Sequence, residues 1–332
     1  MTEPIASRRI SVIIPTYNRA DMVVKCVTSV LEADWENLEV IVVDDCSTDA
    51  TQETMAAAFG EDCHVVCIKN KQNSLSAYSR NHGASIATGD YLFFLDDDNI
   101  VHKDIFIELL ASFDRHPEAG LVAPITGNYS RGRLRVWTIG SYFNPWTSMG
   151  RDVRPLPEFV EDIPSDILDY PTRYSPNAFM VSRAAFNAAR GFDEVMRMQF
   201  DESDFGYRVC EAGFSAFIAA RAITEHHGYL DPDTTPVLRG MGIGRPERAF
   251  AFGRNRTIFA RRHFSFLQAL SVAFAFAPLS AVYYGWVALR NHRADIAWAY
   301  IKGSFAGTFG IYDRKYICKA QAIKPYSASQ VN

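Results

Sequence analysis

The sequence lacks the glycine-rich loops that bind phosphate groups in two widespread nucleotide-binding folds. No G-x-G-x-x-G and no G-x-x-x-x-G-K-[ST] motif follows any predicted strand, which argues against a Rossmann dinucleotide site and against a P-loop. The sequence also lacks excess positive charge, since its net charge is −4 and its pI about 6.1. The overall charge therefore gives no support to a role in binding nucleic acid.

Cysteines are few, and the N-terminal stretch lacks the apolar run of a signal peptide. The six cysteines are scattered, and free thiols in a reducing cytosol are their simplest explanation. The spacing Cys63-His64-x-x-Cys67 suggests zinc, but no second ligand pair is near and the run is apolar, so we expect buried cysteines. An apolar fraction of 48% over 332 residues excludes a disordered chain and predicts a substantial core.

The most informative stretch is an apolar run that ends in three acids. Residues 91–95 carry no charge, and Asp96, Asp97 and Asp98 follow them directly. The run predicts a strand buried on both faces, and three carboxylates cannot share that burial. We therefore expect them in the crevice at the carboxyl end of the strand, where open α/β sheets bind ligands. Such oxygen ligands suit Mg²⁺ or Mn²⁺ shared with substrate phosphates. The alternative is a capped helix with solvated acids in its first turn.

Strands and helices alternate with short links over the first part of the chain. Apolar runs predict strands at 10–14, 40–43, 64–68, 91–95 and 121–125. This alternation indicates βαβ units and a mostly parallel sheet. Parallel strands end at the same edge, so the polar segments 15–19, 44–45 and 96–98 are expected to line one pocket.

The middle of the chain is less regular. Residues 131–139 are consistent with a strand of an antiparallel excursion, and the proline-rich residues 154–171 are interpreted as a loop. A loop of that length is usually a lid or a binding surface. A strand at 179–181 and a helix at 183–190, closed by Gly191, resume the pattern.

Two later clusters carry candidate chemistry. Asp201, Glu202 and Asp204 lie in the first turn of a predicted helix, where acids either stabilise the helix terminus or supply a general base. His226 and His227 follow a short strand, and one of them is a candidate for a metal or phosphate role, the alternative being a structural histidine.

Taken together, these motifs resemble the family 2 glycosyltransferases with the GT-A fold. The matching segments are 12–19, 42–49, 80–83, 89–98, 191–194, 201–204 and 254–256. Their order and spacing agree over roughly residues 8 to 260. The resemblance implies an α/β GT-A domain over residues 1–232, with a Rossmann-like, mostly parallel sheet flanked by helices. A C-terminal basic and apolar helical region, membrane-associated, would occupy residues 233–332.

The resemblance also implies an activity and a site. The activity is inverting transfer of a sugar from a nucleotide-diphosphate sugar, UDP- or dTDP-linked, to a hydroxyl of a glycan or polyprenyl-linked acceptor, assisted by Mg²⁺ or Mn²⁺. The residues implied in nucleotide binding are Pro15, Thr16, Tyr17, Asn18, Arg19, Asp44, Asp45, Arg80 and Asp97. Those implied in metal binding are Asp96, Asp98 and His226. Glu202 occupies the position of the catalytic base, and Asp201 is the residue before it.

Two departures from the family pattern and two alternatives stay open. Cys46 replaces the usual glycine after the aspartate pair, and Asn99 replaces a frequent fourth acid. One alternative is a sugar-phosphate nucleotidyltransferase, which requires a glycine-rich loop where residues 15–19 stand. The other is an inactive GT-A-like binding protein.

The last hundred residues carry signals of membrane contact. Seven arginines and one acid lie between residues 239 and 262, and the next 25 residues, 265–289, carry no charge. Basic flanks with aromatic residues are typical of segments at a bilayer surface. We expect residues 245–310 to contact the inner face of the cell membrane, making the protein cytoplasmic and peripheral. A true span, and a soluble lobe or dimer surface, are the alternatives, and no oligomeric state is assigned.

Overall fold

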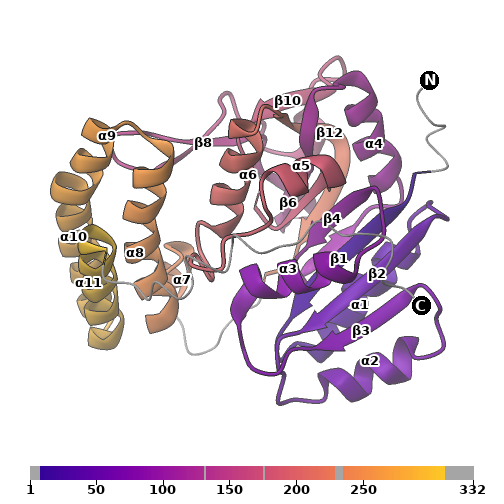
Figure 1. Cartoon of the computed structure of the whole chain (residues 1–332), viewed down its shortest axis with the longest axis horizontal. Helices are drawn as coiled ribbons and strands as arrows, with labels where there is room; N and C mark the ends of the chain where they lie inside the picture. The colour runs from indigo at the N-terminus through magenta and orange to yellow at the C-terminus, as the bar shows by residue number, and fades with distance from the viewer. Residues whose placement is uncertain (1–7, 131, 175, 229–234, 311–332) are drawn as a thin grey trace.

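The computed structural model describes residues 8–130, 132–174, 176–228 and 235–310. These residues form a ten-stranded sheet with helices on both faces, and a group of C-terminal helices that lies beside it (Figure 1). The α/β class predicted from the sequence is confirmed.

The sheet contains both parallel and antiparallel strands. The strands of the N-terminal part of the chain are parallel, as the sequence predicts. In spatial order its strands are β10 (Asp169–Thr172), β12 (Ser215–His226), β6 (Ala119–Ser130), β11 (Ala178–Ser182), β4 (Tyr91–Leu95), β1 (Ile10–Thr16), β2 (Leu38–Asp44) and β3 (Val65–Lys69). β4, β1, β2 and β3 are mutually parallel, and β6 is parallel to β12. β11 is antiparallel to both of its neighbours, β4 and β6. β6 and β12 therefore run in the same direction as β4.

The irregular middle of the chain adds short strands to this sheet. β5 (Asn99–Val101) pairs with β12, and β7 (Arg133–Thr138) pairs with β6. β8 (Ser141–Phe143) and β9 (Gly150–Asp152) form a separate hairpin, and a short 3₁₀ turn, η2, covers Val160–Asp162. The strand predicted within 131–139 is confirmed. The loop predicted over 154–171 is wrong at its end, because β10 pairs there with β12 and satisfies its backbone groups in the sheet.

Helices cover the two faces of the sheet in separate sets. On one face lie α1 (Ala20–Leu31), α2 (Thr51–Phe59) and α4 (Ile105–Arg115); on the other lie α3 (Leu75–Ile86), α5 (Arg183–Ala188) and α6 (Asp201–Glu211). Side chains alternate along β1 accordingly: Val12 and Ile14 pack into the first core, and Ile13 packs into the second.

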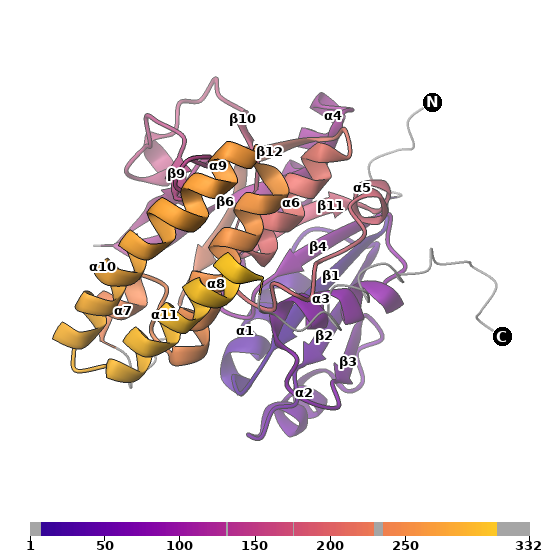
Figure 2. The ribbon, with the colours of Figure 1, turned by 60° about the vertical axis from the view of Figure 1, so that its left-hand side comes forward.

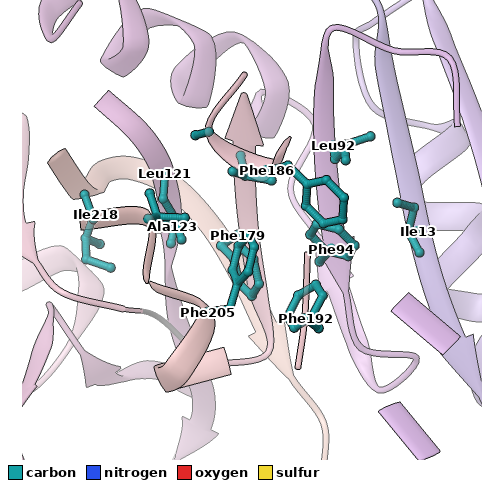
Figure 3. Packing of buried hydrophobic residues seen from close by; sticks show 14 of the residues in the cluster. Ile13, Leu92, Phe94, Leu121, Ala123, Phe179, Phe186, Phe192, Phe205 and Ile218 are labelled. Atoms are coloured by element: carbon teal, nitrogen blue, oxygen red, sulfur yellow. The ribbon is translucent and has the colours of Figure 1, made fainter. Parts of the chain in front are cut away.

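The second core is rich in phenylalanine and lies beneath the end of β4. Figure 3 shows Phe94 packed among Phe179, Phe192 and Phe205. The rings of Phe94 and Phe192 are 4.9 Å apart edge to face, and those of Phe192 and Phe205 are stacked at 4.5 Å. Such aromatic pairs contribute about 0.5–1.5 kcal/mol beyond the area they bury. They form a rigid base for the acids that follow β4.

The prediction of buried cysteines at 63 and 67 is wrong. Both Cys63 and Cys67 are exposed, while Cys26 on α1 is buried. The reason is topological, since β3 is the last strand in the order of the sheet that the described residues form. Cys318 lies outside the described residues.

The C-terminal group consists of α7 (Pro236–Gly240), α8 (Pro246–His263), α9 (Phe266–Leu270), α10 (Ala277–Arg290) and α11 (Ala294–Phe309). A π-helical segment, η3 (Ser271–Phe276), joins α9 to α10. The run Phe266–Arg290 is the single described helix that is long and apolar enough to cross a bilayer, judged by length and composition alone, and 28% of its most apolar window is buried. The predicted division at residue 232 lies outside the described residues.

Glycines allow α8 and α11 to pack backbone against backbone. A Cβ atom at Gly253 would lie 2.7 Å from the carbonyl oxygen of Tyr300, and one at Gly303 or Gly307 would collide with the carbonyl oxygens of Phe250 and Arg254. Larger residues at these positions would force the helices apart. The two helices therefore behave as one unit.

That unit is fixed to the α/β part through buried charges. Nη1 of Arg262 and Nε2 of His263, both at the end of α8, each lie 3.0 Å from Oδ1 of Asp204 on α6. Arg262 also pairs with Asp193, and Nε of Arg208 donates to Oδ2 of Asp204 at 2.8 Å. Asp204 is fully buried, so these cations compensate a charge that water does not reach.

Candidate active site

The carboxyl ends of β1, β2 and β4 open into one cavity of about 690 Å³. From these strand ends it is lined by Pro15, Thr16, Tyr17, Asn18, Arg19, Asp45, Asp96 and Asp97. The prediction that the three polar strand ends line one pocket is thus confirmed. Helix α3 contributes Ser76 and Ser79 to the same wall.

The turn after β1 is tied to the turn after β2. The amide of Asn18 donates to Oγ of Ser47 at 2.9 Å, and its side-chain oxygen accepts from the amide of Thr48 at 2.8 Å. Asn18 has a φ of 52° and Cys46 a φ of 67°, a left-handed conformation in which glycine is unstrained. This explains why a glycine is usual at position 46, and the turn persists with Cys46 in its place.

The structure separates the roles of Asp44 and Asp45. Asp44 is buried and accepts from the amide of Ser47 at 2.7 Å and from Nε2 of Gln52 at 2.8 Å, and it does not line the cavity. Asp45 lines the cavity and accepts from the amides of Ser74 and Leu75 at 2.8 and 2.7 Å. Of the two, Asp45 is the one that a ligand in the cavity would contact.

The acids after β4 point in different directions. Asp97 is buried and accepts from Oγ1 of Thr16 at 2.7 Å and from Nη1 of Arg19 at 2.6 Å. Burial raises the pKa of Asp97 to about 6, although Arg19 opposes the rise. Asp97 thus fixes the turn after β1, whereas Asp96 contacts Arg80 and Asp98 lies near His226.

Arg80 is the centre of a buried cluster of carboxylates. Its Nη2 donates to Oδ1 of Asp96 and to Oε1 of Glu202, and its Nη1 donates to Oδ2 of Asp201, each at 2.7 Å. Only 3% of the Arg80 side chain is exposed. Burial alone would lower the pKa of Arg80, but the charges of Glu202, Asp96 and Asp201 raise it. Arg80 is not among the lining residues of the cavity; in this structure it neutralises acids, and its role in nucleotide binding stays a prediction.

Two sequence motifs bind each other beneath this cluster. The side chain of Asn81 donates to the carbonyl of Phe192 at 2.9 Å and accepts from its amide at 2.8 Å. The guanidinium of Arg80 lies over the Phe192 ring, 5.4 Å from its centre. The contacts between segments 80–83 and 191–194 therefore orient Arg80.

Glu202 and Asp201 differ in their surroundings. Oδ2 of Asp201 also accepts from Oγ of Ser76 at 3.0 Å, and burial raises the pKa of Asp201. Glu202 accepts from the amide of Asn177 at 3.1 Å, on the same Oε1 that Arg80 contacts. Burial, opposed by Arg80, raises the pKa of Glu202 to about 8. Asp201 anchors Arg80, whereas Glu202 has a second oxygen with no bond to another described residue.

The backbone that leads into α6 is strained and is held by α8. Arg197, Gln199 and Phe200 have φ values of 58°, 62° and 66°. Nδ2 of Asn255 donates to the carbonyls of Met196, Met198 and Gln199 at 2.7, 2.9 and 2.7 Å. The 254–256 motif thus positions the turn that carries Asp201 and Glu202.

The three predicted metal ligands do not all meet. Oδ1 of Asp98 lies 3.6 Å from Nε2 of His226, but Oδ1 of Asp96 is bound to Arg80. Within the described ranges, the one trio of possible ligands whose atoms lie within 4.8 Å of each other is Asp62, Cys63 and His64, near the edge of β3. His227 pairs instead with Glu225, at 3.2 Å.

Asp98 and His226 fit a divalent cation as a pair. Burial and the charge of Asp96 raise the pKa of Asp98, a repulsion that a cation would relieve. Asn128 donates to the His226 carbonyl at 2.7 Å, and the Trp137 ring lies 5.2 Å from the imidazole. A carboxylate and an oriented imidazole are a suitable donor set for Mn²⁺.

Sequence reasoning missed the far wall of the cavity. Arg239, Gly244, Arg245, Glu247 and Arg248 line it, although they belong to the C-terminal region. The sequence alone predicts that the arginines of this region contact a bilayer surface. Four of the seven are bound inside the protein: Arg254 to Val195, Arg256 beneath aromatic rings, Arg261 to Thr308 and Arg262 to Asp193. No local pattern in the sequence distinguishes these four from the three at the cavity.

Sequence comparison matches residues 11–170 to the family model described as "Glycosyl transferase family 2". Glycosyltransferase GlyG of Streptococcus pneumoniae serotype 4 is 36% identical over 139 residues, which cover 41% of this chain and 46% of that protein. The amylovoran biosynthesis glycosyltransferase AmsB of Erwinia amylovora is 35% identical over 109 residues, 32% of this chain and 36% of its own. The match thus spans less than half the length of these relatives.

Solved structures share the architecture over most of the chain. The structure of GalNAc-T7 with UDP, GalNAc and Mn²⁺ superposes with a TM-score of 0.59 at 15% identity, covering 82% of this chain and 57% of that one. The mannosyltransferase PcManGT from Pyrobaculum calidifontis, in complex with GDP-Man and Mn²⁺, superposes with a TM-score of 0.55 at 14% identity, covering 92% and 88%.

These superpositions identify the fold as GT-A, the architecture of a large class of glycosyltransferases. Within that class, residues 11–170 match the model of glycosyl transferase family 2, and the chain is similar to that family over this segment.

Proposed function

We propose that the chain is an inverting glycosyltransferase that moves a sugar from a nucleotide-diphosphate sugar to a hydroxyl of a glycan or polyprenyl-linked acceptor. One observation carries the proposal. Asp96 of the D-x-D motif and Glu202 of the acidic helix turn both contact Nη2 of Arg80, each at 2.7 Å. The group beside the leaving diphosphate and the group that activates the acceptor thus belong to one charge network.

The cavity suits a nucleotide-sugar donor in size and lining. A volume of about 690 Å³ is within the usual range for small-molecule sites. The turn at residues 15–19 and Asp45 hold the base and ribose in this proposal, and a UDP- or dTDP-sugar is the donor. GalNAc-T7 was solved with UDP and PcManGT with GDP-Man, which supports a nucleoside diphosphate in the same place.

A divalent cation, Mg²⁺ or Mn²⁺, is part of the proposal. Asp98 and His226 would hold it directly, and Asp96, about 30% exposed on its side chain, would join when its bond to Arg80 is exchanged. Such an ion supplies positive charge to the departing diphosphate. Arg19, 3.4 Å from Oδ2 of Asp98, opposes the rise in the pKa of Asp98 and orients that carboxylate.

Glu202 is the base in this scheme. Arg80 and the amide of Asn177 fix Oε1, which leaves Oε2 to take the proton of the acceptor hydroxyl as the hydroxyl attacks the anomeric carbon. A carboxyl group with a pKa of about 8 is, once deprotonated, a stronger base than an ordinary glutamate, so it accepts the proton of the hydroxyl more readily. One displacement inverts the anomeric centre.

Ligand-induced stabilisation tests the donor and the cation together. In a thermal-shift panel of UDP, dTDP, GDP and ADP, with and without Mn²⁺, we expect one nucleotide to stabilise the protein by about 2.7 kcal/mol at 100 times its Kd. Asp98→Asn should remove the part of this stabilisation that depends on Mn²⁺. Asp62→Asn, a change in the trio Asp62, Cys63 and His64 near β3, is the matched control and should leave the Mn²⁺-dependent stabilisation intact. If no nucleoside diphosphate raises the unfolding temperature with or without Mn²⁺, the proposed activity is wrong.

We further propose that the C-terminal helices lie on the inner face of the cell membrane. α9, η3 and α10 follow one another in one helical run, and α11 lies beside that run at the end of the molecule (Figure 2). Large apolar side chains on them are exposed, among them Phe266, Phe274, Val282, Trp286, Trp298 and Phe305. Between residues 266 and 309 the charged side chains are three cations and one acid, and basic residues beside aromatic ones favour an anionic lipid interface.

Vesicle flotation tests this contact. The protein should float with vesicles of 30% phosphatidylserine and remain unbound with pure phosphatidylcholine. Burial of a large side chain is worth about 1.5–3 kcal/mol, so Phe266→Ser with Trp286→Ser should lower partitioning at least tenfold. Tyr129→Ser, an exposed aromatic on β6, is the control. Wild-type protein that stays unbound and instead dimerises through this face would overturn the membrane proposal.

A further inference from the structure

The wall of the cavity opposite the strand ends is built by the C-terminal helices. Arg239 on α7 and Arg248 in the first turn of α8 line it, with Gly244 and Arg245 between them. The same cavity contains Tyr17 and Asp45. A single molecule that fills it therefore touches the nucleotide-binding turn on one side and these arginines on the other.

Arg239 and Arg248 differ from the other arginines of this region. Within the described part of the chain, neither forms an ion pair, whereas Arg262 is bound to two acids and Arg256 lies beneath aromatic rings. Arg248 is exposed and Arg239 is half-buried. Both guanidinium groups are thus available to a ligand.

The acids across the cavity do not neutralise these two arginines. Asp97 is bound to Thr16 and Arg19, and Asp45 accepts from two backbone amides and from Nδ2 of Asn70 at 2.8 Å. Glu247, the neighbour of Arg248, is the one acid that α7 and α8 bring to the lining. The far wall therefore has a positive surplus, which favours an anionic group in the space between.

We propose that Arg239 and Arg248 bind the diphosphate of the nucleotide donor, so that the C-terminal helices complete the donor site. This inference rests on the proposed function. Arginine binds phosphate oxygens with two parallel donors, and the positive end of the α8 dipole adds to the attraction. The diphosphate is preferred over a lipid phosphate because its nucleoside would occupy residues 15–19 and Asp45 in the same cavity.

Calorimetric titration with and without phosphates on the ligand tests the inference. Wild type, Arg239→Ala, Arg248→Ala and the double variant are titrated with UDP, dTDP and GDP in Mn²⁺, and with the matching nucleosides. A charged hydrogen bond is worth about tenfold in affinity, so we expect about a tenfold loss of nucleoside-diphosphate affinity for each substitution and about a hundredfold for both. Nucleoside affinity should stay unchanged, which also shows that the variants are folded. Arg221→Ala, an exposed arginine on β12, is the matched control and should bind as wild type.

The outcomes separate the two proposals. Equal nucleoside-diphosphate affinity in wild type and double variant overturns the arginine inference alone. Absence of nucleoside-diphosphate binding to wild type overturns the proposed function and the inference with it. A third arm uses vesicles with 10% phosphatidic acid: if the double variant loses vesicle binding but keeps nucleotide affinity, the two arginines serve a lipid phosphate and the inference is wrong.

Discussion

Replacing Glu202 by glutamine is expected to lower the rate of sugar transfer by about 10²–10⁴, the usual contribution of a general base. Glutamine keeps the size of the side chain and a contact with Arg80, so the fold and the donor cavity should remain. The measurement is the transfer rate with the donor found in the thermal-shift panel. Nucleotide affinity of the variant, measured by calorimetry, should equal that of wild type.

The pH profile gives an independent check on the same residue. Because Glu202 acts as a base only when deprotonated, the wild-type rate should rise with pH and level off above its pKa of about 8. The residual rate of Glu202→Gln should lack this rise. Glu118→Gln is the control: the Glu118 side chain is exposed and pairs with His116 at 3.6 Å, and the pH profile of this variant should match that of wild type.

Near-normal turnover of Glu202→Gln would move the base to Asp201, which shares Arg80. That result would not assign the role of base to Asp204. That carboxylate is fully buried among Arg208, Arg262 and His263, so no acceptor hydroxyl reaches it.

Replacing Asp204 by asparagine is expected to reduce the free energy of unfolding by about 3–5 kcal/mol at pH 7, because it leaves buried cations without their partner. The bonds lost join α6 to the end of α8. Urea denaturation followed by tryptophan fluorescence measures the effect. Asp295→Asn removes an exposed pair with Arg293 and should change stability by no more than about 1 kcal/mol.

Acid titration of stability distinguishes the charge of Asp204 from its shape. Burial alone would raise its pKa, but Arg208, His263 and Arg262 hold the pKa of Asp204 well below its ordinary range. A carboxyl group of this kind contributes stability above its unfolded-state pKa of about 3.9 and loses it as pH falls toward the folded value. The difference in free energy of unfolding between wild type and Asp204→Asn should therefore become smaller below about pH 4. A constant difference down to pH 2 would contradict a role for the charge.

The parts of the fold and site that the sequence predicts are those decided by neighbours in the chain. Apolar runs of four or five residues, each followed by a polar turn, fix β1, β2 and β4 and which of their ends carry ligand groups. The rule that parallel strands end at one edge then brings residues 15–19, Asp45 and Asp96 together without further information. The same local reasoning predicts α6 and the acids in its first turn.

The parts that it does not predict depend on contacts between distant segments. Arg80 meets Asp201 and Glu202 across 121 and 122 positions, and no spacing rule reveals that it neutralises acids. The exposure of Cys67 follows from the place of β3 at the edge of the sheet, which periodicity does not encode. The arginines of residues 239–262 all look alike in sequence, and only packing decides which three reach the cavity.

Asn255 is remote from the proposed reacting atoms, yet it affects the position of the proposed base Glu202. Each left-handed residue in the turn before α6 stores about 1–3 kcal/mol, and the three carbonyls bound by Asn255 keep the turn from relaxing. Release of that amide would let the turn return to ordinary backbone and carry its carboxylates away from their arginine. A substitution in α8 that lowers turnover therefore does not show that a lipid contact was lost. The same helix also holds the strained turn that carries Glu202.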